Sequence, residues 1–462
     1  MSNKNFVNMN VNPCKMCMPM GAALALKGIE KSIMFLHGSQ GCSTYIRRHL
    51  ATHYNEPIDI ASSSLTEKGT VYGGEENLKK GLVNTIRLYN PALIGIATTC
   101  LAETIGEDIV RTAREFAAEY DKDIRLVPIS TPGYSGSQYE GYYTTLRSIL
   151  QYVCEDSPGN GNINIITGSM TPGDVRRLKD ILNSFAIKYI LFPDISETLD
   201  GSVMKDYKKI PEGGTTIQEI KKMSGSTATI EFGKLVEPNV SPGKYLEDNY
   251  DVPLYSLPVP IGLENTDELI NTFAQLSRNQ ITPRIKSAKG RMLDGMIDSH
   301  KYNAMGRAAV FGEPEIVYSV SKLCLENGIV PAVIATGSSS KNLTELLKEE
   351  TAGFSEEIVI LDETDFEKIR ELVRVYDINI LIGSSDGKFI TEKDGIPLIR
   401  IGFPVHDHIG AQRQVNIGYE GSLLFLDKIT NTLLDLKHNN YREDLYKQYF
   451  EERSGHDGKS YV

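Results

Sequence analysis

The sequence predicts an α/β protein made of three Rossmann-like domains, each built around a parallel sheet. Two observations support this prediction. The chain has 462 residues, and at roughly 150 residues per domain this length corresponds to about three domains. Short apolar runs also alternate with helical patterns along three successive segments, as they do in βαβ units. We place the domains at residues 1–160, 161–300 and 301–462.

In the first domain, apolar runs are followed by a short loop and then by a helical pattern. The two strand-to-helix loops are HGSQGC, which begins at His37, and TTCLAE, which begins at Thr98. In an open parallel sheet, ligands bind beyond the carboxyl ends of the strands, where such loops lie. The predicted strands are residues 32–36, 92–97 and 124–130, and the predicted helices are residues 43–54 and 104–120.

The second domain contains a clear helix start. Thr171 precedes Pro172, and Asp174 follows three residues after the threonine, which together predict a capping box with proline in the first turn. A Gly- and Lys-rich loop then leads into a helix, and a long amphipathic helix connects to the third domain. The predicted elements are strands at 162–168 and 189–194, a helix at 169–187, a loop that leads into a helix around 208–220, and a helix at 278–303.

The third domain repeats the strand and helix alternation most regularly. Gly328 stands where the helix that follows the first strand would end, because glycine adopts the left-handed conformation found there. The polar tail, residues 445–462, is expected to fray. The predicted strands are residues 308–312, 330–337, 357–362 and 378–383, and the predicted helices are residues 313–327 and 363–376.

Composition excludes several classes of protein. The formal net charge is −11, from 49 basic and 60 acidic residues, which argues against nucleic-acid binding because phosphate contacts need a basic surface. No apolar run approaches the ~18 residues of a membrane span, and the N-terminus lacks the apolar core of a signal peptide. We therefore expect a cytoplasmic protein that binds neither nucleic acid nor membrane.

Three of the six cysteines fall where chemistry is expected. Cys42 closes one strand-to-helix loop, Cys100 lies in the other, and Cys17 directly precedes a helical pattern. Their thiols can meet along one edge of the first domain, and their spacing is too wide for a local zinc site. Helix starts would lower the thiol pKa values. Gly38 and Gly41 would let the backbone approach a bulky inorganic group.

The alternative for each cysteine is an ordinary unligated thiol, and spacing alone makes the two readings equally frequent. Cys324 lies in an apolar helical register, so we expect it in a core, and we expect the same of Cys154. Cys14 forms a C-x-x-C pair with Cys17. It is either a spare ligand or an exposed loop thiol, and we expect the loop thiol.

Several stretches resemble the component 1 proteins of nitrogenase, specifically their beta-type branch. They are CMPMGAALALKGIEKSIMFLHGSQGC, ASSSLTEKGTVYGGEENLKKGL, IGIATTCLAETIGEDI, PLIRIGFPVHDH and GYEGS. The resemblance spans nearly the whole chain. It implies the three-domain nitrogenase component 1 architecture, an alpha-type partner subunit in an α2β2 heterotetramer, and the nitrogenase iron protein as electron donor.

The resemblance also implies a cofactor. Cys17, Cys42 and Cys100 match the cysteines with which the catalytic beta subunit holds its half of the eight-iron P-cluster, at the interface with the alpha-type subunit. We therefore expect an iron–sulfur cluster of four-iron or P-cluster type, shared with the partner. Of the C-x-x-C pair, Cys17 is then the ligand and Cys14 is an extra cysteine.

Two paralogues share these signatures: the catalytic beta subunit and the beta-type subunit of the scaffold on which the iron–molybdenum cofactor matures. GSMTPGDVRRLKDILNSF and LFPDISETLDG look like the scaffold, and Gly133 stands where the catalytic subunit commonly carries a serine that can join the oxidised P-cluster. Well-known scaffolds, however, keep only the cysteine that matches Cys42. We expect a non-catalytic scaffold subunit that supports cofactor maturation in nitrogen fixation.

The alternative is the beta subunit of a nitrogenase or a nitrogenase-like reductase, such as a methylthio-alkane reductase, which relays electrons through a P-cluster. A third reading is a redox-inert interaction subunit whose thiols are only core. No G-x-x-x-x-G-K-[ST] motif occurs, so ATP hydrolysis would belong to another protein. The last third of the chain also lacks a cysteine placed to anchor a large cofactor.

Four further positions carry polar groups of interest. His406 and His408 flank Asp407 and could bind a metal with it, but alternate loop residues usually point apart, so we expect solvated or capping histidines. His37 begins the loop of Cys42 and either bonds a cluster sulfide or packs in the core. Glu103 either steers a proton or, as we expect, forms a salt bridge.

A basic pair lies on the helix after Cys42. Arg47 and Arg48 are adjacent in YIRRH, which is most often a solvated helix face. Beside a site that receives electrons, the same pair would help to dock an acidic partner surface.

Overall fold

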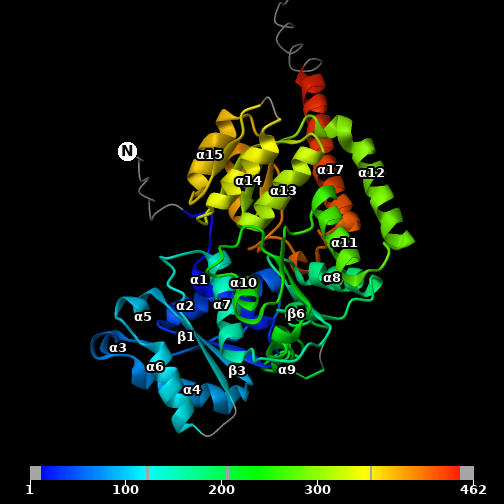
Figure 1. Cartoon of the computed structure of the whole chain (residues 1–462). Helices are drawn as coiled ribbons and strands as arrows, with labels where there is room; N and C mark the ends of the chain where they lie inside the picture. Colours follow the sequence, from blue (N-terminus) through cyan, green and yellow to red (C-terminus); the bar gives the residue numbers. More distant parts are fainter. Residues whose placement is uncertain (1–11, 121–123, 204, 207, 354–355, 448–462) are drawn as a thin grey trace, which may run out of the picture.

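The computed structural model describes residues 12–120, 124–203, 205–206, 208–353 and 356–447. It contains three parallel sheets, with strand orders β2-β1-β3-β4, β6-β5-β7-β8 and β11-β10-β9-β12-β13. Figure 1 shows α13, α14 and α15 above the helices of the first sheet, and α17 between α13 and α12. The predicted α/β class with parallel sheets is confirmed.

The first sheet contains the three predicted strands and one short strand, β2, that was not predicted. Its fully buried strands β1 and β3 pair along their whole length, Ser32 opposite Leu93 through His37 opposite Thr98. Its strands are β1 (Ser32–His37), β2 (Ala61–Ser62), β3 (Leu93–Thr98) and β4 (Arg125–Ile129). Its helices are α1 (Met18–Lys27), α2 (Gln40–Tyr54), α3 (Glu67–Tyr72), α4 (Glu75–Tyr89), α5 (Cys100–Thr104), α6 (Ile109–Glu119) and α7 (Gln138–Val153).

Both strand-to-helix loops of the first sheet are shorter than predicted. Helix α2 begins at Gln40, capped by the Ser39 hydroxyl, which accepts from the Gly41 N–H at 3.2 Å. The stretch TTCLAE forms the short helix α5 instead of a loop, and Gly106, at φ +77°, separates it from α6. As a result, Cys42 and Cys100 lie within first helical turns.

The second sheet confirms the predicted helix start. In α8 the Thr171 hydroxyl accepts from the Asp174 N–H at 2.9 Å, and the Asp174 carboxylate accepts from the Thr171 N–H at 3.1 Å. The strands are β5 (Ile163–Ile166), β6 (Tyr189–Phe192), β7 (Ala228–Phe232) and β8 (Leu254–Leu257). The helices are α8 (Pro172–Ser184), α9 (Ile217–Lys221), α10 (Pro242–Tyr250), α11 (Leu263–Ser277) and α12 (Pro283–Asn303).

The third sheet has one strand more than the sequence indicated. Gly328 adopts φ +72° just after α13, as predicted for a helix end. The strands are β9 (Arg307–Gly312), β10 (Val330–Thr336), β11 (Val359–Leu361), β12 (Ile380–Gly383) and β13 (Leu398–Arg400). The helices are α13 (Pro314–Glu326), α14 (Lys341–Thr351), α15 (Phe366–Val375), α16 (Lys388–Asp394) and α17 (Gly418–Tyr446). The predicted fraying tail lies outside the described residues beyond residue 447.

The three sheets share one large hydrophobic core. It joins apolar side chains of α1 and α7 to those of β5, β7 and α13, so the segments pack as one body. Helix α17 packs along α12, as Figure 1 shows. No helix in the described part of the chain combines the length and apolar character needed to cross a bilayer.

The start of the chain packs against the third sheet. Cys14 donates its N–H to the Thr364 carbonyl at 3.1 Å and accepts from the Gly337 N–H at 3.2 Å. Its side chain is 6% exposed and packs with Phe311 and Phe366. The expectation that Cys14 is an exposed loop thiol is therefore wrong: residues 12–16 cross to the third sheet, which buries the thiol.

Candidate functional site

Adjacent strand ends of the first sheet present two of the predicted thiols. Strands β1 and β3 are neighbours, and the helices that follow them carry Cys42 and Cys100 in their first turns. Both cysteines are exposed. The next strand, β4, leads into the loop that contains Gly133. The parallel order of the strands thus brings three chain segments to one edge of the sheet.

A close helix crossing places the third thiol. Helices α1 and α7 approach so tightly that a Cβ at Gly21 would lie 1.9 Å from the Gln138 carbonyl oxygen. This crossing fixes the N-terminus of α1, where Cys17 is the N-cap residue and forms an antiparallel bridge with Ser137. Cys17 is half-buried. Its position therefore depends on glycine in the helix interface.

Two of the three thiols border Gly133, and the third lies near both of them. The Gly133 N–H donates to the Cys100 Sγ at 3.2 Å. A Cβ built on Gly133 would lie 3.1 Å from the Cys17 Cβ and 3.3 Å from the Cys100 Sγ. Cys42 is near enough to Cys17 and to Cys100 to interact with both electrostatically. Glycine at 133 thus leaves room beside two of the thiols. We call Cys17, Cys42, Cys100 and Gly133 the thiol edge.

The thiol pKa values differ from the sequence expectation. Burial raises the pKa of Cys17, and electrostatic interaction with the neighbouring Cys42 and Cys100 raises it further. Burial, and then Cys100, also raise the pKa of Cys42. The expected lowering by helix starts is therefore wrong for these two, because desolvation and mutual repulsion exceed the effect of the helix ends. A metal would have to displace these protons.

His37 lies behind the thiol edge and is fully buried. Its Nδ1 is 3.0 Å from the Ser63 hydroxyl and its Nε2 is 3.3 Å from Glu107, whose other oxygen accepts from the Gly74 N–H at 2.6 Å. Both ring nitrogens therefore have protein partners, in agreement with the core reading of this histidine. Glu107 lies 70 residues from His37, and no spacing in the sequence pointed to it.

Glu103 forms hydrogen bonds rather than the salt bridge we expected. Its Oε1 accepts from the hydroxyls of Thr98 and Ser130. These hydroxyls lie at the ends of β3 and β4, so Glu103 ties the two strand ends together. Close packing explains the glycine at position 38, because a Cβ there would lie 2.0 Å from the Thr99 hydroxyl oxygen. A Cβ on Gly41, in contrast, would make only an ordinary contact.

The other cysteines lie elsewhere. Cys324 is fully buried in the large core, as expected, whereas Cys154 is only partly buried at the rim of that core. Among the residues described, no group of three or more His, Cys, Asp or Glu side chains is arranged to hold a single metal ion. The thiol edge is therefore not arranged as a mononuclear metal site.

An ion pair holds the loop that contains His406 and His408. The Arg400 guanidinium binds Asp407 at 2.9 and 2.6 Å and holds the pKa of that carboxyl well below its usual range. His408 is largely exposed, 3.8 Å from Asp407, and the His406 N–H donates to Ser385. This agrees with the expected solvated and capping roles.

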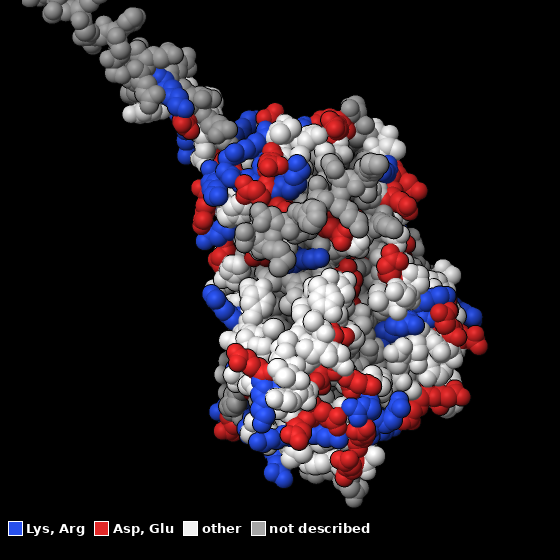
Figure 2. Space-filling model, turned by 90° about the vertical axis from the view of Figure 1, so that its left-hand side faces the viewer, with Lys and Arg blue, Asp and Glu red and all other residues white. Residues whose placement is uncertain are grey.

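The two arginines of the basic pair on α2 have different surroundings. Arg47 donates to the Ile58 carbonyl at 3.1 Å and lies 3.8 Å from Asp59, so it is tied to its own domain. Arg48 is exposed. Figure 2 shows a band of uncharged residues across the face that is on the left in Figure 1, between parts where acidic and basic residues are mixed. No extended basic area is visible on this face among the residues described.

Comparison with known proteins identifies relatives over almost the whole chain. The family model described as nitrogenase component 1 type oxidoreductase matches residues 17–434. The molybdenum-iron protein beta chain of Clostridium pasteurianum is 34% identical, covering 92% of this chain and 94% of that one. That of Methanococcus maripaludis is 35% identical, with the same coverage. The vanadium-iron protein beta chain of Trichormus variabilis is 33% identical, covering 94% and 96%.

A solved structure shows the same arrangement. A chain of nitrogenase Cp1 at pH 6.5 superposes with a TM-score of 0.89 at 32% identity, covering 98% of this chain and 96% of that one. A chain of Cp1 at pH 5, at 15% identity, gives 0.67 and is similar in fold alone.

Proposed function

Because the chain belongs to the nitrogenase component 1 family and is of the beta-chain type, we propose that it is the electron-relaying beta-type subunit of a nitrogenase-type reductase. Cys17, Cys42 and Cys100 hold its half of an interfacial iron–sulfur cluster. The grouping of these three thiols carries the proposal: Cys17 and Cys100 border Gly133, and Cys42 lies close enough to both thiols to interact with them electrostatically. A chain whose cysteines were ordinary core would have no reason to expose two of them at adjacent strand ends.

The thiol edge suits an iron–sulfur group. Thiolates are the usual protein ligands of such clusters, and backbone N–H groups bonded to sulfur raise their reduction potentials. Gly133 supplies such an N–H to Cys100 and adds no side chain beside it. When bound, the cluster supplies one-electron transfer. The protein's part is to hold it through three thiolates and to exclude a fourth ligand at position 133.

Exposure of the thiol edge implies a partner. Cys42 and Cys100 face solvent in the isolated chain, and three ligands from one chain leave a larger cluster to be completed by another. The partner is an alpha-type subunit in an α2β2 heterotetramer, and the nitrogenase iron protein delivers the electrons. Since this sequence lacks a phosphate-loop motif, ATP hydrolysis belongs to that protein.

The second candidate is the scaffold for iron–molybdenum cofactor assembly, and Gly133 favours it. In a catalytic beta subunit, a serine at this position can join the oxidised cluster. Here the residue has no hydroxyl, although a Cβ would lie 3.3 Å from the Cys100 Sγ. A scaffold has no need of that redox-linked ligand. The two candidates share the thiol edge and differ in whether the complex turns over substrate.

Anaerobic purification of the chain with its native partner, followed by acetylene reduction with the iron protein and ATP, separates the candidates. The reductase proposal predicts turnover that is retained in the control variant Cys154→Ala and lost in Cys42→Ala. An iron-replete complex without turnover contradicts the reductase and supports the scaffold. A complex free of iron contradicts both and supports a redox-inert interaction subunit.

A further inference from the structure

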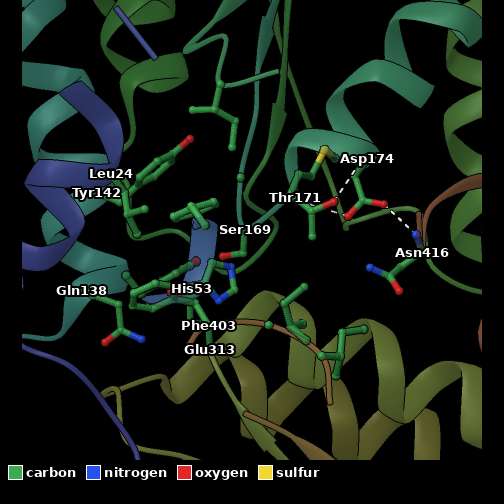
Figure 3. A pocket seen from close by; sticks show the side chains of 18 residues that line it. Leu24, His53, Gln138, Tyr142, Ser169, Thr171, Asp174, Glu313, Phe403 and Asn416 are labelled. Carbon is green, nitrogen blue, oxygen red and sulfur yellow. Dashed lines mark hydrogen bonds between the residues drawn. The ribbon is translucent and has the colours of Figure 1, made fainter. Parts of the chain in front are cut away.

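A cavity lies where the three sheets meet, and none of its lining residues belongs to the thiol edge. It has a volume of about 60 Å³ and is lined by side chains from α1, α2, α7, α8 and α13 and from the segments after β13. Figure 3 shows these side chains around the cavity. A buried space needs roughly 10–15 Å³ to hold one water, so this one has room for roughly four to six non-hydrogen atoms.

Two polar side chains in the wall are buried and unsatisfied. His53 is 3% exposed, and its Nδ1 accepts from the Val405 N–H at 2.8 Å, which leaves the proton on Nε2. Asn416 is 5% exposed, and its backbone N–H donates to Asp174 at 2.6 Å. Neither the His53 Nε2–H nor the Asn416 carboxamide has a hydrogen-bond partner among the described residues. Buried polar groups normally have partners.

The two groups lie on opposite sides of the cavity. Both are lining residues, and Figure 3 shows the His53 ring and the Asn416 carboxamide turned toward the middle from different segments. Histidine offers one donor, whereas the carboxamide offers a donor and an acceptor. Together they match a ligand with a carbonyl oxygen next to an N–H or O–H group.

The remaining wall selects against charge. Its carboxyl groups are Asp174, which accepts from three backbone N–H groups, and Glu313, which bonds Gln138 and Ser169. Burial raises the pKa of both carboxyls and lowers that of His53 to about 3, so the imidazole stays neutral. No Lys or Arg lines the cavity among the described residues. An anion would meet acidic groups without a counter-charge, at a high desolvation cost.

We propose that this cavity is a binding site for a small uncharged molecule of the amide class, held by the His53 Nε2–H and the Asn416 carboxamide. Apolar walls, including Leu24 and Phe403, enclose the rest of the ligand. The wall also contacts the thiol-bearing segment, because Gln138 Oε1 accepts from the N–H of Met16 at 2.6 Å, one residue before Cys17.

The test uses two probes of equal size and different charge, acetamide and acetate. Each is titrated into the full chain, purified with the subunits that accompany it, and binding is followed by saturation-transfer NMR. We expect saturable binding of acetamide with a dissociation constant on the order of 1 mM, as suits so few atoms. We expect no saturable binding of acetate.

Two variants locate the site. Asn416→Leu removes the carboxamide and should weaken the binding of acetamide roughly tenfold. Leu24→Phe fills the cavity without removing a hydrogen bond and should abolish binding; it also replaces the first variant if that one fails to fold. Equal binding of acetate and acetamide, unchanged acetamide binding in a folded variant, or no saturable binding of acetamide would each overturn the proposal.

Discussion

The backbone N–H of Gly133 points at the sulfur of Cys100, with the nitrogen 3.2 Å from Sγ. The same glycine borders Cys17, whose Cβ would be 3.1 Å from a side chain at 133. The loop after β4 is therefore shaped around two thiols that are far apart in the sequence. It donates a hydrogen bond to one and contributes no side-chain ligand.

Substitution of Gly133 tests this arrangement. Gly133→Ser places a hydroxyl beside Cys17 and Cys100, so we expect the oxidised complex to gain an altered electron paramagnetic resonance spectrum while the reduced spectrum changes little. Gly133→Ala is the matched control, because it adds the same Cβ without an oxygen donor. Identical oxidised spectra in the two variants would show that position 133 does not face the bound group.

Cys14 provides the contrast to the thiol edge. It is buried beside Phe311 and Phe366 in the third-sheet core, so Cys14→Ala should lower the free energy of unfolding by about 1–2 kcal/mol through the cavity it leaves. Iron content should remain that of the wild type. Iron analysis and denaturant unfolding of the same sample check both statements. Loss of iron with unchanged stability would make Cys14 a ligand after all.

Local signals in the sequence were sufficient for much of the fold. The Thr171 and Asp174 capping box and the left-handed Gly328 depend on neighbouring residues, and both were predicted correctly. The burial of Cys14 was missed because it depends on contacts with residues far along the chain, in the third sheet. The sequence of α5 predicts a loop, since five residues give too little periodicity to indicate a helix.

The candidate site was predicted in its residues but not in its electrostatics. The strand-end rule was sufficient to bring Cys42 and Cys100 together. The sign of the pKa shifts depends on burial and on distances between thiols, which no pattern encodes. Ser130, which bonds Glu103, and Glu107, which bonds His37, lie far from those residues along the chain, so these hydrogen bonds had no sequence signal either.

His53 should make the fold sensitive to acid. Burial lowers its pKa from 6.5 to about 3, and the nearby His406 contributes a smaller part of this lowering. Since the unfolded chain binds the proton below pH 6.5 and the native chain does not, stability falls as pH decreases. From pH 7 to 5 the loss attributable to His53 is about 2 kcal/mol.

The matching variant is His53→Asn, whose oxygen can accept from the Val405 N–H without titrating. Urea unfolding at pH 7 and pH 5 should show a smaller acid loss in this variant than in the wild type. His438→Asn, at an exposed position on α17, should leave the acid loss unchanged. An identical loss in wild type and His53→Asn would mean that His53 is protonated in the native state.

Glu231 should make the stability of the fold depend on pH in the direction opposite to His53. It is buried, accepts from Ser241 and Gly243, and burial raises its pKa from 4.5 to about 7. The native state keeps a proton that the unfolded chain loses above pH 4.5, so stability falls as pH rises from 4.5 to 7. Glu231→Gln removes this loss. Between pH 4 and pH 8, the free energy of unfolding should therefore fall by about 3 kcal/mol more in the wild type than in Glu231→Gln.

The control for Glu231 is Glu76→Gln on α4, away from the buried carboxyl. Thermal or urea unfolding at pH 4 and pH 8 should give this variant the pH dependence of the wild type. If Glu231→Gln also keeps the wild-type dependence, the carboxyl is ionised in the native state and its burial is offset by its hydrogen bonds.

The most direct test of the shared iron–sulfur site is the iron content of Cys42→Ala, purified anaerobically with the partner beside Cys154→Ala. Cys42 is the ligand that both proposed functions require, so we expect Cys42→Ala to lose most of its iron and its paramagnetic resonance spectrum, while Cys154→Ala keeps both. Comparable losses in Cys17→Ala and Cys100→Ala indicate a P-cluster type, and retention in those two indicates a four-iron type. Wild-type iron and an unchanged spectrum in Cys42→Ala would contradict an interfacial cluster of either kind.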